Sequence, residues 1–295
     1  MTAIFEITGG IGKHIAASSV ITTYKKAHPG HDIIVVCAWP EIFIHNPLIS
    51  RVLKIGMTPH FYKDFIYKND CRIFCQDPYK QESHILKRKH LISTWCDLIQ
   101  IQTDEINPQI FPNFRNKELA RDIIGATSKP VLIFQPFGGP GKSSQSWNYS
   151  WMRDIHPQLA QDLVNVLQQT YHIIHICYEF HPKLENCVRF DQEIAKNTLF
   201  SLLAFSQKRL LIDSCLQHAA AALKLSSTVQ WIATQPEIFG YDMHTNLLPR
   251  QTHKEGTIDS YLYDYNFLGQ IHECPYSSPL DIFDGEAILK SILNP

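Results

Sequence analysis

The chain runs through the same order of elements twice, and this repetition limits its possible folds more than any other feature. Residues 3–7 are a short apolar run, and a glycine-rich turn at 8–12 follows it at once. A helical pattern covers 13–27, and 32–37 is an apolar, β-branched run typical of a buried parallel strand. Strand, glycine turn, helix and strand together make a βαβ unit.

The second half begins the same order again. It predicts a strand at 131–135, a second glycine-rich turn at 136–141, a helix at 150–169 and a strand at 172–178. The later predicted elements are a helix at 198–205, a strand at 209–212, a helix that Asp213 and Ser214 cap and that runs to Leu223, and a strand at 228–233. Alternating strands and helices favour an α/β fold with parallel sheets.

A break near residue 125 separates the two series, where Gly125, Ser128 and Pro130 stand close together. We therefore predict two α/β domains, 1–125 and 126–295, with a ligand-binding cleft between them. The length of 295 residues suits two domains of ~150 residues each. A last helix is expected within 281–293, and it is expected to pack back on the first domain.

The region between the two series has shorter apolar runs and weaker periodicity. Short apolar runs at 52–55 and 72–74 predict two more strands, and the spacing of 83–99 predicts one helix. That helix contains the basic run 87–90 (Lys-Arg-Lys-His), which is either a solvated face or a patch for an anionic acceptor. Residues 240–280 predict loops and short pieces.

Composition indicates an ordinary globular protein, with 44% hydrophobic and 19% charged residues. The first 128 residues hold 15 lysines and arginines against 12 aspartates and glutamates, a net charge of +3, while the rest carries −4. The spacing of the eight cysteines does not match that of zinc ligands, so we expect free thiols in a reducing cytoplasm. We expect no signal peptide and no transmembrane segment.

The first glycine turn is a candidate phosphate site. Gly10 and Gly12 let the backbone approach a ligand closely, and the N-terminus of the following helix attracts anions. Lys13 and His14 fall in the first turn of that helix. The alternative is a tight turn between strand and helix that binds no ligand, because such glycine motifs also occur by chance.

The second glycine turn carries more polar groups. Gly138 and Gly139 can form an anion-binding nest of backbone amides, and Lys142 and Ser143 add donors suited to phosphate oxygens. The segment is longer than most connections between a strand and a helix, which favours a functional loop over a flexible surface loop.

A third candidate lies where the strand at 209–212 ends. Asp213 or Ser214 can cap the next helix and leave other amides free for phosphate, and His218 follows one turn later. The alternative is a plain helix cap with a packed or solvated histidine, which is the more frequent role of a single histidine.

Three segments together resemble the bacterial heptosyltransferases of glycosyltransferase family nine. They are Ile7–Gly12, the run from Pro136 to Trp147 with Trp151 after it, and Asp213-Ser214 with His218 and the alanine-rich run to Leu223. The resemblance covers most of 1–40 and 130–236, and the third segment is the most specific.

This resemblance implies a GT-B fold, in which two Rossmann-like domains face each other across a cleft. It implies that the acceptor binds the first domain and the nucleotide-sugar mostly the second. It implies no metal and no cofactor besides the donor substrate. The residues that would hold the donor's phosphates are Gly138, Gly139, Lys142, Ser143, Ser214, Cys215, Leu216 and His218, with Gly10 and Gly12 facing them. By the same resemblance Asp213 would face the donor sugar, and Tyr178 and Glu179 the base and ribose.

The sequence departs from the family at three positions. Lys13 stands where the family has an aspartate that serves as general base. A lysine is a poor base unless burial lowers its pKa, so it suits a clamp on phosphate or on an anionic acceptor better. His14 or a carboxylate from 41–125 could then be the base. Cys215 replaces a glycine, and Gln145 replaces a lysine.

The function that the resemblance implies is inverting, metal-independent transfer of a hexosyl- or heptosyl-type sugar to a glycan or another hydroxyl acceptor. One alternative acceptor is modified (hydroxymethylated) DNA, for which the nearby aromatics would stack bases. These aromatics are Trp39, Phe61, Tyr62, Phe65 and Tyr67. A second alternative is an epimerase-like or nucleotide-sugar-binding protein without transfer activity.

Overall fold

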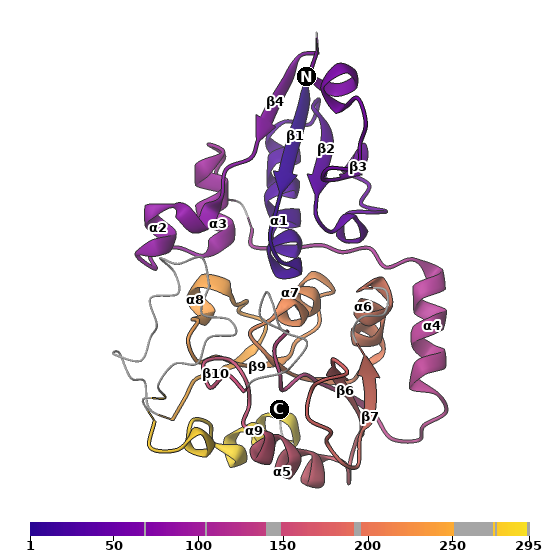
Figure 1. The fold of residues 1–295 in the computed structure, drawn as a ribbon, viewed down its shortest axis with the longest axis vertical. Coiled ribbons are helices and arrows are strands. Elements are labelled where there is room, and N and C mark those ends of the chain that lie inside the picture. Colours follow the sequence, from indigo (N-terminus) through magenta and orange to yellow (C-terminus); the bar gives the residue numbers. More distant parts are fainter. Residues whose placement is uncertain are drawn as a thin grey trace.

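The computed structural model describes residues 1–67, 69–103, 105–139, 149–191, 196–250, 274 and 276–293. Two fully parallel sheets, one in each half of the chain, form two α/β layers that lie one above the other in Figure 1. The predicted α/β class is therefore confirmed, and the chain passes once from the first sheet to the second.

The first sheet has the strand order β3-β2-β1-β4. Its strands are β1 (Thr2–Ile7), β2 (Asp32–Cys37), β3 (Arg51–Lys54) and β4 (Cys71–Phe74). Helix α1 (Ile11–Ala27) follows β1, and the chain continues to β2 on one side and returns to β4 on the other. The direction of winding thus reverses between β1 and β4, which is where open parallel sheets bind ligands.

The predicted helix over 83–99 is broken in two, α2 (Glu82–Ile85) and α3 (Leu91–Leu98). Lys87 adopts a left-handed backbone (φ 54°), and the His90 side chain accepts the Ile92 amide to start the second helix. Two charges of the basic run are paired: Arg88 with Glu82 at 3.1 Å and Lys89 with Asp97 at 2.6 Å. The run therefore behaves as a solvated, partly neutralised surface. Shorter pieces of this domain are η1 (Pro40–Ile42), η2 (Tyr62–Ile66) and η3 (Pro78–Lys80).

The second sheet has the order β10-β9-β8-β5-β6-β7, with a winding reversal between β5 and β8. Its strands are β5 (Val131–Phe134), β6 (His172–Cys177), β7 (Val188–Asp191), β8 (Lys208–Ile212), β9 (Thr228–Gln230) and β10 (Thr245–Leu247). Its helices are α5 (Pro157–Leu167), α6 (Lys196–Phe205), α7 (Cys215–Ala222) and α8 (Pro236–Phe239). The helix predicted from residue 150 begins only at Pro157, where the His156 side chain caps it.

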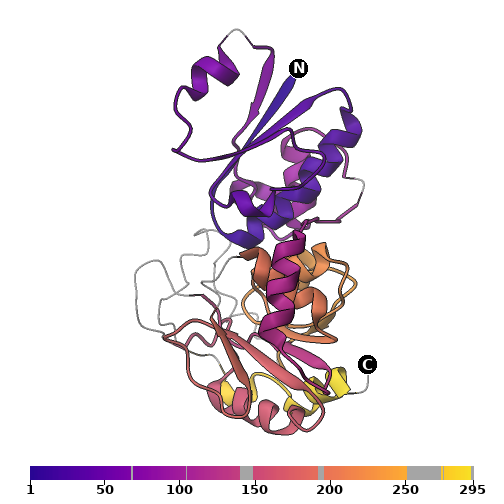
Figure 2. The same cartoon turned by 90° about the vertical axis from the view of Figure 1, so that its right-hand side faces the viewer.

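The two halves share one hydrophobic core. Helix α1 packs on α7, and a single cluster of buried residues joins Ile15 and Val20 to Leu216 and Ala219. Helix α4 (Phe114–Ile124), which ends the first half, packs on α6 of the second, with Asn116 donating to Thr198 at 3.3 Å. Figure 2 shows α4 running along the second half.

The last helix does not pack on the first domain as expected. Helix α9 (Gly285–Leu293) follows η5 (Pro279–Asp281) and packs on α5 and β9 of the second sheet. Its buried Ile288 and Ile292 are one turn apart and join the second core cluster beside Leu163. In the described part of the chain, no helix combines the length and apolar character needed to cross a bilayer.

Candidate functional site

The glycine turn after β1 lies directly against the helix after β8. A Cβ on Gly12 would stand 2.8 Å from the Cδ2 atom of His218 and 3.6 Å from the Cα of Cys215. Gly12 is thus explained by the close approach of α1 and α7. Gly10 is different: it is exposed at the N-cap of α1, and nothing lies within 4 Å of where its Cβ would be. Of the two predicted glycines, Gly10 is the one with open backbone.

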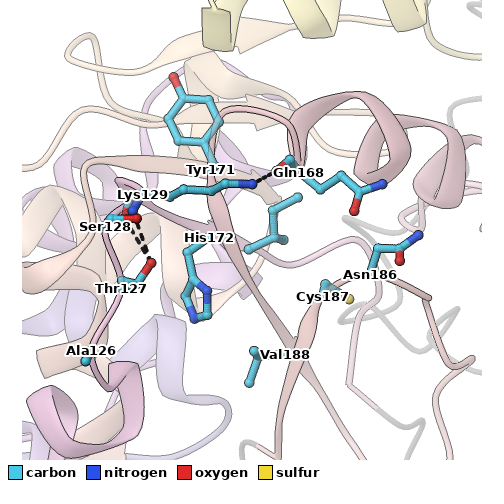
Figure 3. A pocket seen from close by; sticks show the side chains of 11 residues that line it. Ala126, Thr127, Ser128, Lys129, Gln168, Tyr171, His172, Asn186, Cys187 and Val188 are labelled. Atoms are coloured by element: carbon cyan, nitrogen blue, oxygen red, sulfur yellow. Dashed lines mark hydrogen bonds between the residues drawn. The ribbon is translucent and has the colours of Figure 1, made fainter.

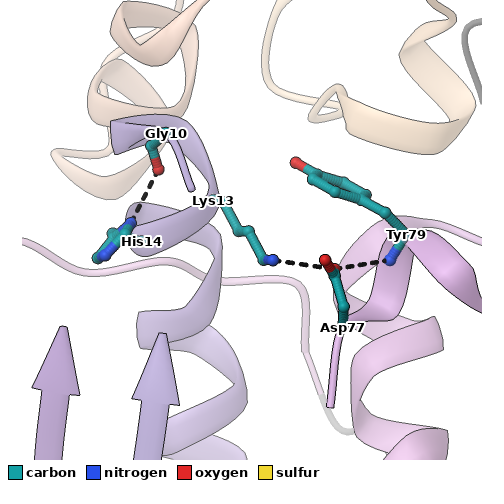
Figure 4. Close-up of polar contacts among 5 residues, drawn as sticks. All are labelled: Gly10, Lys13, His14, Asp77 and Tyr79. Carbon is teal, nitrogen blue, oxygen red and sulfur yellow. Dashed lines mark hydrogen bonds and ion pairs between the residues drawn. The ribbon is translucent and has the colours of Figure 1, made fainter. Parts of the chain in front are cut away.

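Lys13 is buried and paired. Its ammonium lies 2.9 Å from Asp77 Oδ1, and its side chain is only 5% exposed. The same ammonium lies over the rings of Tyr79 and Trp95, at 5.0 and 5.8 Å from their centroids. Figure 4 shows Lys13 reaching from the first turn of α1 toward Asp77, which also accepts the Tyr79 backbone N–H.

His14 is fully buried, and both of its ring nitrogens contact the backbone. Nδ1 lies 2.8 Å from the Gly10 carbonyl oxygen, and Nε2 accepts the Ala38 N–H at 3.3 Å. This pairing places the proton on Nδ1. Burial lowers the pKa of His14 to about 4, against the opposing effect of its backbone hydrogen bonds. In this arrangement His14 ties α1 to the end of β2.

Asp213 begins the polar cluster of the second domain. Its carboxylate accepts a short hydrogen bond from the Thr234 hydroxyl and a long one of 3.5 Å from Gln217, and its backbone carbonyl accepts Arg153 Nε at 2.9 Å. Desolvation raises the pKa of the Asp213 carboxyl, while the Thr234 bond and the Arg153 charge oppose the rise. The side chain remains partly exposed, so it can face a ligand at this edge.

Helix α7 starts as predicted, with Ser214 as its N-cap. The Ser214 hydroxyl accepts the Leu216 amide at 3.3 Å and donates to Gln135, the residue that follows β5. The cap therefore links the two strands that flank the winding reversal of the second sheet. Cys215 is partly exposed at the first helical position, and burial raises the pKa of its thiol.

His218 is buried in a hydrogen-bonded network. Gln217 donates to its Nε2 at 3.1 Å, so its Nδ1 carries the proton and donates to the Tyr241 hydroxyl at 2.8 Å. Burial lowers the pKa of His218 to about 3, with a smaller contribution from the nearby His90 and His244. His218 is thus a neutral group that holds α7 against Tyr241 and meets Gly12 of the first domain.

The second glycine turn lies beside this cluster. The Gly138 amide donates to Asp154 at 2.7 Å, and a Cβ on Gly138 would stand 3.0 Å from the Arg153 side chain. Gly139 is exposed next to the Tyr178 ring. The other two predicted residues of this turn, Lys142 and Ser143, lie outside the described residues.

Tyr178 and Glu179 follow β6 as predicted. Arg189 holds both backbone carbonyls, at 3.0 Å for Tyr178 and 3.1 Å for Glu179. The Tyr178 ring stacks on Phe180, with 5.3 Å between centroids. These contacts place an exposed carboxylate and a stacked aromatic pair beside Gly139, at the carboxyl edge of the second sheet.

The aromatic residues of the first domain do not gather at one place. Trp39 lies at the carboxyl edge, where it donates to the Gly9 carbonyl at 3.1 Å and faces the Lys196 ammonium across the domains. The other four, from Phe61 to Tyr67, belong to the segment around η2, which lies at the far end of the first sheet (Figure 1). Of these five aromatics, Trp39 alone therefore lies at the edge where a nucleic-acid acceptor would need them.

A surface depression of about 530 Å³ opens at the opposite edge of the second sheet. Figure 3 shows residues before β5 and at the starts of β6 and β7 around it, among them Lys129, which donates to the Gln168 carbonyl at 2.6 Å. Because ligands of parallel α/β sheets bind outside the carboxyl ends, this depression is a poor candidate for the site.

Sequence reasoning missed two charged residues at the facing edges, Asp77 and Arg153. Asp77 follows β4 by three residues and precedes a proline, so a carboxylate just past a predicted strand was the available signal. Arg153 precedes α5 and had no signal, because only the folded turn places it against Gly138 and Asp213.

Two parallel sheets, each with polar residues at its carboxyl edge, define a two-domain α/β protein. Solved glycosyltransferases have this fold. A family 9 glycosyl transferase from Veillonella parvula matches with a TM-score of 0.67 at 10% identity, over 98% of this chain and 95% of that one.

Two Escherichia coli proteins are similar in the same way. The ADP-heptose lps heptosyltransferase II gives a TM-score of 0.63 at 12% identity, over 90% of this chain and 99% of that one. TibC, a dodecameric glycosyltransferase, gives 0.65 at 10% identity, over 98% of this chain and 75% of that one. No protein-family model matches the sequence, and no curated protein matches it significantly. The resemblance to glycosyltransferase family nine is thus confirmed for the fold.

Proposed function

We propose that the protein is an inverting, metal-independent glycosyltransferase of the GT-B type. It moves a sugar from a nucleoside-diphosphate sugar to a hydroxyl group. The observation that carries this proposal is the meeting of the three predicted segments: Gly12 touches His218, and Asp213 and the Gly138 turn lie beside the start of the same helix.

The donor binds mainly to the second domain. Arg153 and the N-terminus of α7 supply positive charge for a diphosphate, and Tyr178 offers a ring for the base. Lys196 adds a second cation at the start of α6. Solved relatives of this fold contain ADP or an ADP-heptose analogue, so adenosine-diphosphate sugars are the first donors to test.

The reaction is a single displacement at the anomeric carbon. The acceptor oxygen forms a bond to this carbon from the face opposite the diphosphate, while the bond from carbon to the diphosphate oxygen breaks. The electron pair of the broken bond leaves with the nucleoside diphosphate, whose charge Arg153 and the α7 dipole stabilise. The acceptor's proton passes to a base on the first domain.

The acceptor binds at the carboxyl edge of the first sheet, where Trp39 and the exposed Gly10 lie. A glycan suits an indole face at this position better than DNA does. Four of the five aromatics expected to stack nucleic-acid bases lie elsewhere, and Arg88 and Lys89 of the basic run are paired with carboxylates.

The test is a thermal-shift screen of nucleoside diphosphates and nucleotide-sugars, starting with ADP-D-β-D-heptose. A ligand that binds only the folded state stabilises it by ~2.7 kcal/mol at a hundredfold excess over Kd. Asp213→Ala should abolish the shift, and Asp162→Ala, on the exposed face of α5, should keep it. A folded sample that responds to no nucleotide at millimolar concentration would rule the proposal out.

A further inference from the structure

The first sheet has its winding reversal between β1 and β4, and the loops that follow these two strands meet there. Helix α1, which follows β1, carries Lys13 in its first turn, and the loop after β4 carries Asp77. Their side chains join at 2.9 Å. This ion pair therefore stands at the place where an open parallel sheet binds its ligand.

The pair is asymmetric in its exposure. The Lys13 side chain is 5% exposed and lies between two aromatic rings, while the Asp77 side chain is 25% exposed. Both hydrogen bonds to the Asp77 carboxylate, from Lys13 and from the Tyr79 amide, end on Oδ1. Among the residues that the structure describes, no donor reaches Oδ2, so this oxygen is available to a substrate hydroxyl.

Stability alone gives a weak reason for such a pair. Removing two charges from water costs about as much as their attraction returns, and apolar residues of the same size often stabilise a fold better. A fixed, partly exposed carboxylate with one unoccupied oxygen is instead the arrangement of a general base.

Three other ionisable groups near this edge are less suited to the role. His14 has both ring nitrogens on backbone groups. Asp213 belongs to the second domain, where its carboxylate accepts from Thr234 and Gln217. Glu6 is exposed in β1 itself, ahead of the turn.

We propose that Asp77 is the general base of the transfer reaction, and that Lys13 positions its carboxylate. This inference rests on the proposed function. Oδ2 accepts the proton of the attacking hydroxyl as the oxygen bonds to the anomeric carbon, and the nucleoside diphosphate leaves with the electron pair of the broken bond. Lys13 keeps Oδ1 in place, so the second oxygen points at the acceptor.

The experiment compares wild-type protein with Asp77→Asn and Asp77→Ala. The probe is the nucleotide-sugar with the largest thermal shift, beginning with ADP-D-β-D-heptose, and the readout is release of the nucleoside diphosphate with water as acceptor. The matched control is Asp97→Asn, because Asp97 is also a carboxylate of the first domain paired with a lysine, Lys89, at 2.6 Å. Loss of a general base lowers the rate about 10²–10⁴-fold.

Azide separates a base from a structural residue. It is an anionic nucleophile with no proton to remove, so it attacks the anomeric carbon and forms a glycosyl azide without help from a carboxylate. We expect azide to restore turnover in Asp77→Ala and to change the wild-type rate little. Donor affinity, measured by calorimetry, should be the same in both proteins. Circular dichroism checks folding, and Asp77→Glu, which keeps the Lys13 partner, should retain part of the activity.

The outcomes separate this inference from the proposed function. If Asp77→Asn turns over as fast as wild-type protein, Asp77 is not the general base, and the proposed transferase function still stands. Lost turnover that azide fails to restore, together with lost donor binding, would make Asp77 structural and also overturn the base. Wild-type protein that binds no nucleotide-sugar, or that binds one and transfers its sugar neither to water nor to a glycan acceptor, would overturn the base because no reaction remains for it to serve.

Discussion

At the scale of single residues, neighbouring positions at the start of α1 have different structural roles. Gly12 permits contact between two helices, whereas Gly10 leaves backbone open, although the sequence presents them as equal members of one motif. The role of Lys13 is likewise visible only in the fold, because its ion-pair partner Asp77 comes from a segment with no recognisable motif. Motif spacing predicts which residues gather at a site, and packing decides what each one does there.

Gly12→Ala should destabilise the protein by about 1–3 kcal/mol, because its Cβ would overlap His218 at 2.8 Å and push α1 from α7. The free energy of unfolding, from denaturant titration, measures this. Gly30→Ala is the control, since nothing lies within 4 Å of its Cβ position. Equal effects of the two substitutions would contradict the close contact between these helices.

Arg153→Leu should raise the Kd for the nucleoside diphosphate about 10–100-fold, because a charged hydrogen bond to a phosphate is worth about 1.5–3 kcal/mol. Isothermal titration calorimetry measures the change. Arg88→Leu should leave the Kd unaltered, because Arg88 forms an exposed pair with Glu82 on the other domain. Unchanged affinity in Arg153→Leu would remove this arginine from the donor site.

At the scale of elements, the first domain's α2 and α3 meet α7, α8 and the loop before β10 through histidines, of which His90 is half-buried and the others are buried. His90 contacts the Gly240 carbonyl at 3.0 Å, and the rings of His90, His218 and His244 surround Tyr241. His84 lies against Phe239. Burial lowers the pKa of His84, His90 and His244 to about 4 and that of His218 to about 3.

Stability should therefore fall in mild acid. The folded-state pKa values lie below the unfolded value of 6.5, so above pH 6.5 these histidines are neutral in both states and contribute nothing to the pH dependence. As the pH falls toward 4, only the unfolded chain binds protons, and each histidine removes up to about 1.4 kcal/mol per pH unit. Urea titrations at about pH 8, 7, 6 and 5 measure the loss.

His244→Gln is the variant that tests this origin. It should show a smaller loss of stability between about pH 7 and pH 5 than wild-type protein, because one fewer buried imidazole takes up a proton on unfolding. Its stability at pH 8 gives the cost of the substitution itself. An identical loss in both proteins would assign the pH dependence to other groups, among them the buried His14 and His175.

The sequence predicted most elements because apolar runs and helical spacing are local signals. The central strands β1, β2, β5, β6 and β8 were all anticipated. Edge strands β7 and β10 were missed, since β7 begins with an exposed valine and β10 has only three residues. The break between α2 and α3 was missed because a left-handed lysine leaves no mark in composition.

At the scale of the whole molecule, the predicted halves are coupled by packing. Helix α4 precedes residue 125 in the chain but packs on α6, and one core cluster spans both sheets. We expect one cooperative heat-absorption peak in scanning calorimetry, which a bound nucleotide shifts upward as a whole. Two separate peaks, of which the ligand moves only one, would contradict this coupling.

The candidate site was predictable only in part at this scale. The Asp213–His218 segment and the two glycine turns could be proposed from the sequence because each follows a strand end. Asp77 could not be proposed individually, because its position depends on the strand order of the first sheet. Arg153 could not be proposed either, because its side chain reaches Asp213 only in the folded turn. The sheet order brings β4 beside β1 and so places Asp77 against Lys13.

The most direct test of inverting, metal-independent sugar transfer is the stereochemistry of the product. The purified protein is incubated with a nucleotide-sugar that it binds and with a panel of glycan acceptors. Proton NMR then follows nucleoside diphosphate release and the anomeric configuration of the new bond. We predict that the nucleoside diphosphate is released without added metal and that the product has the opposite anomeric configuration to the donor. Retention of configuration, or no transfer to any acceptor from a donor that binds, would contradict it.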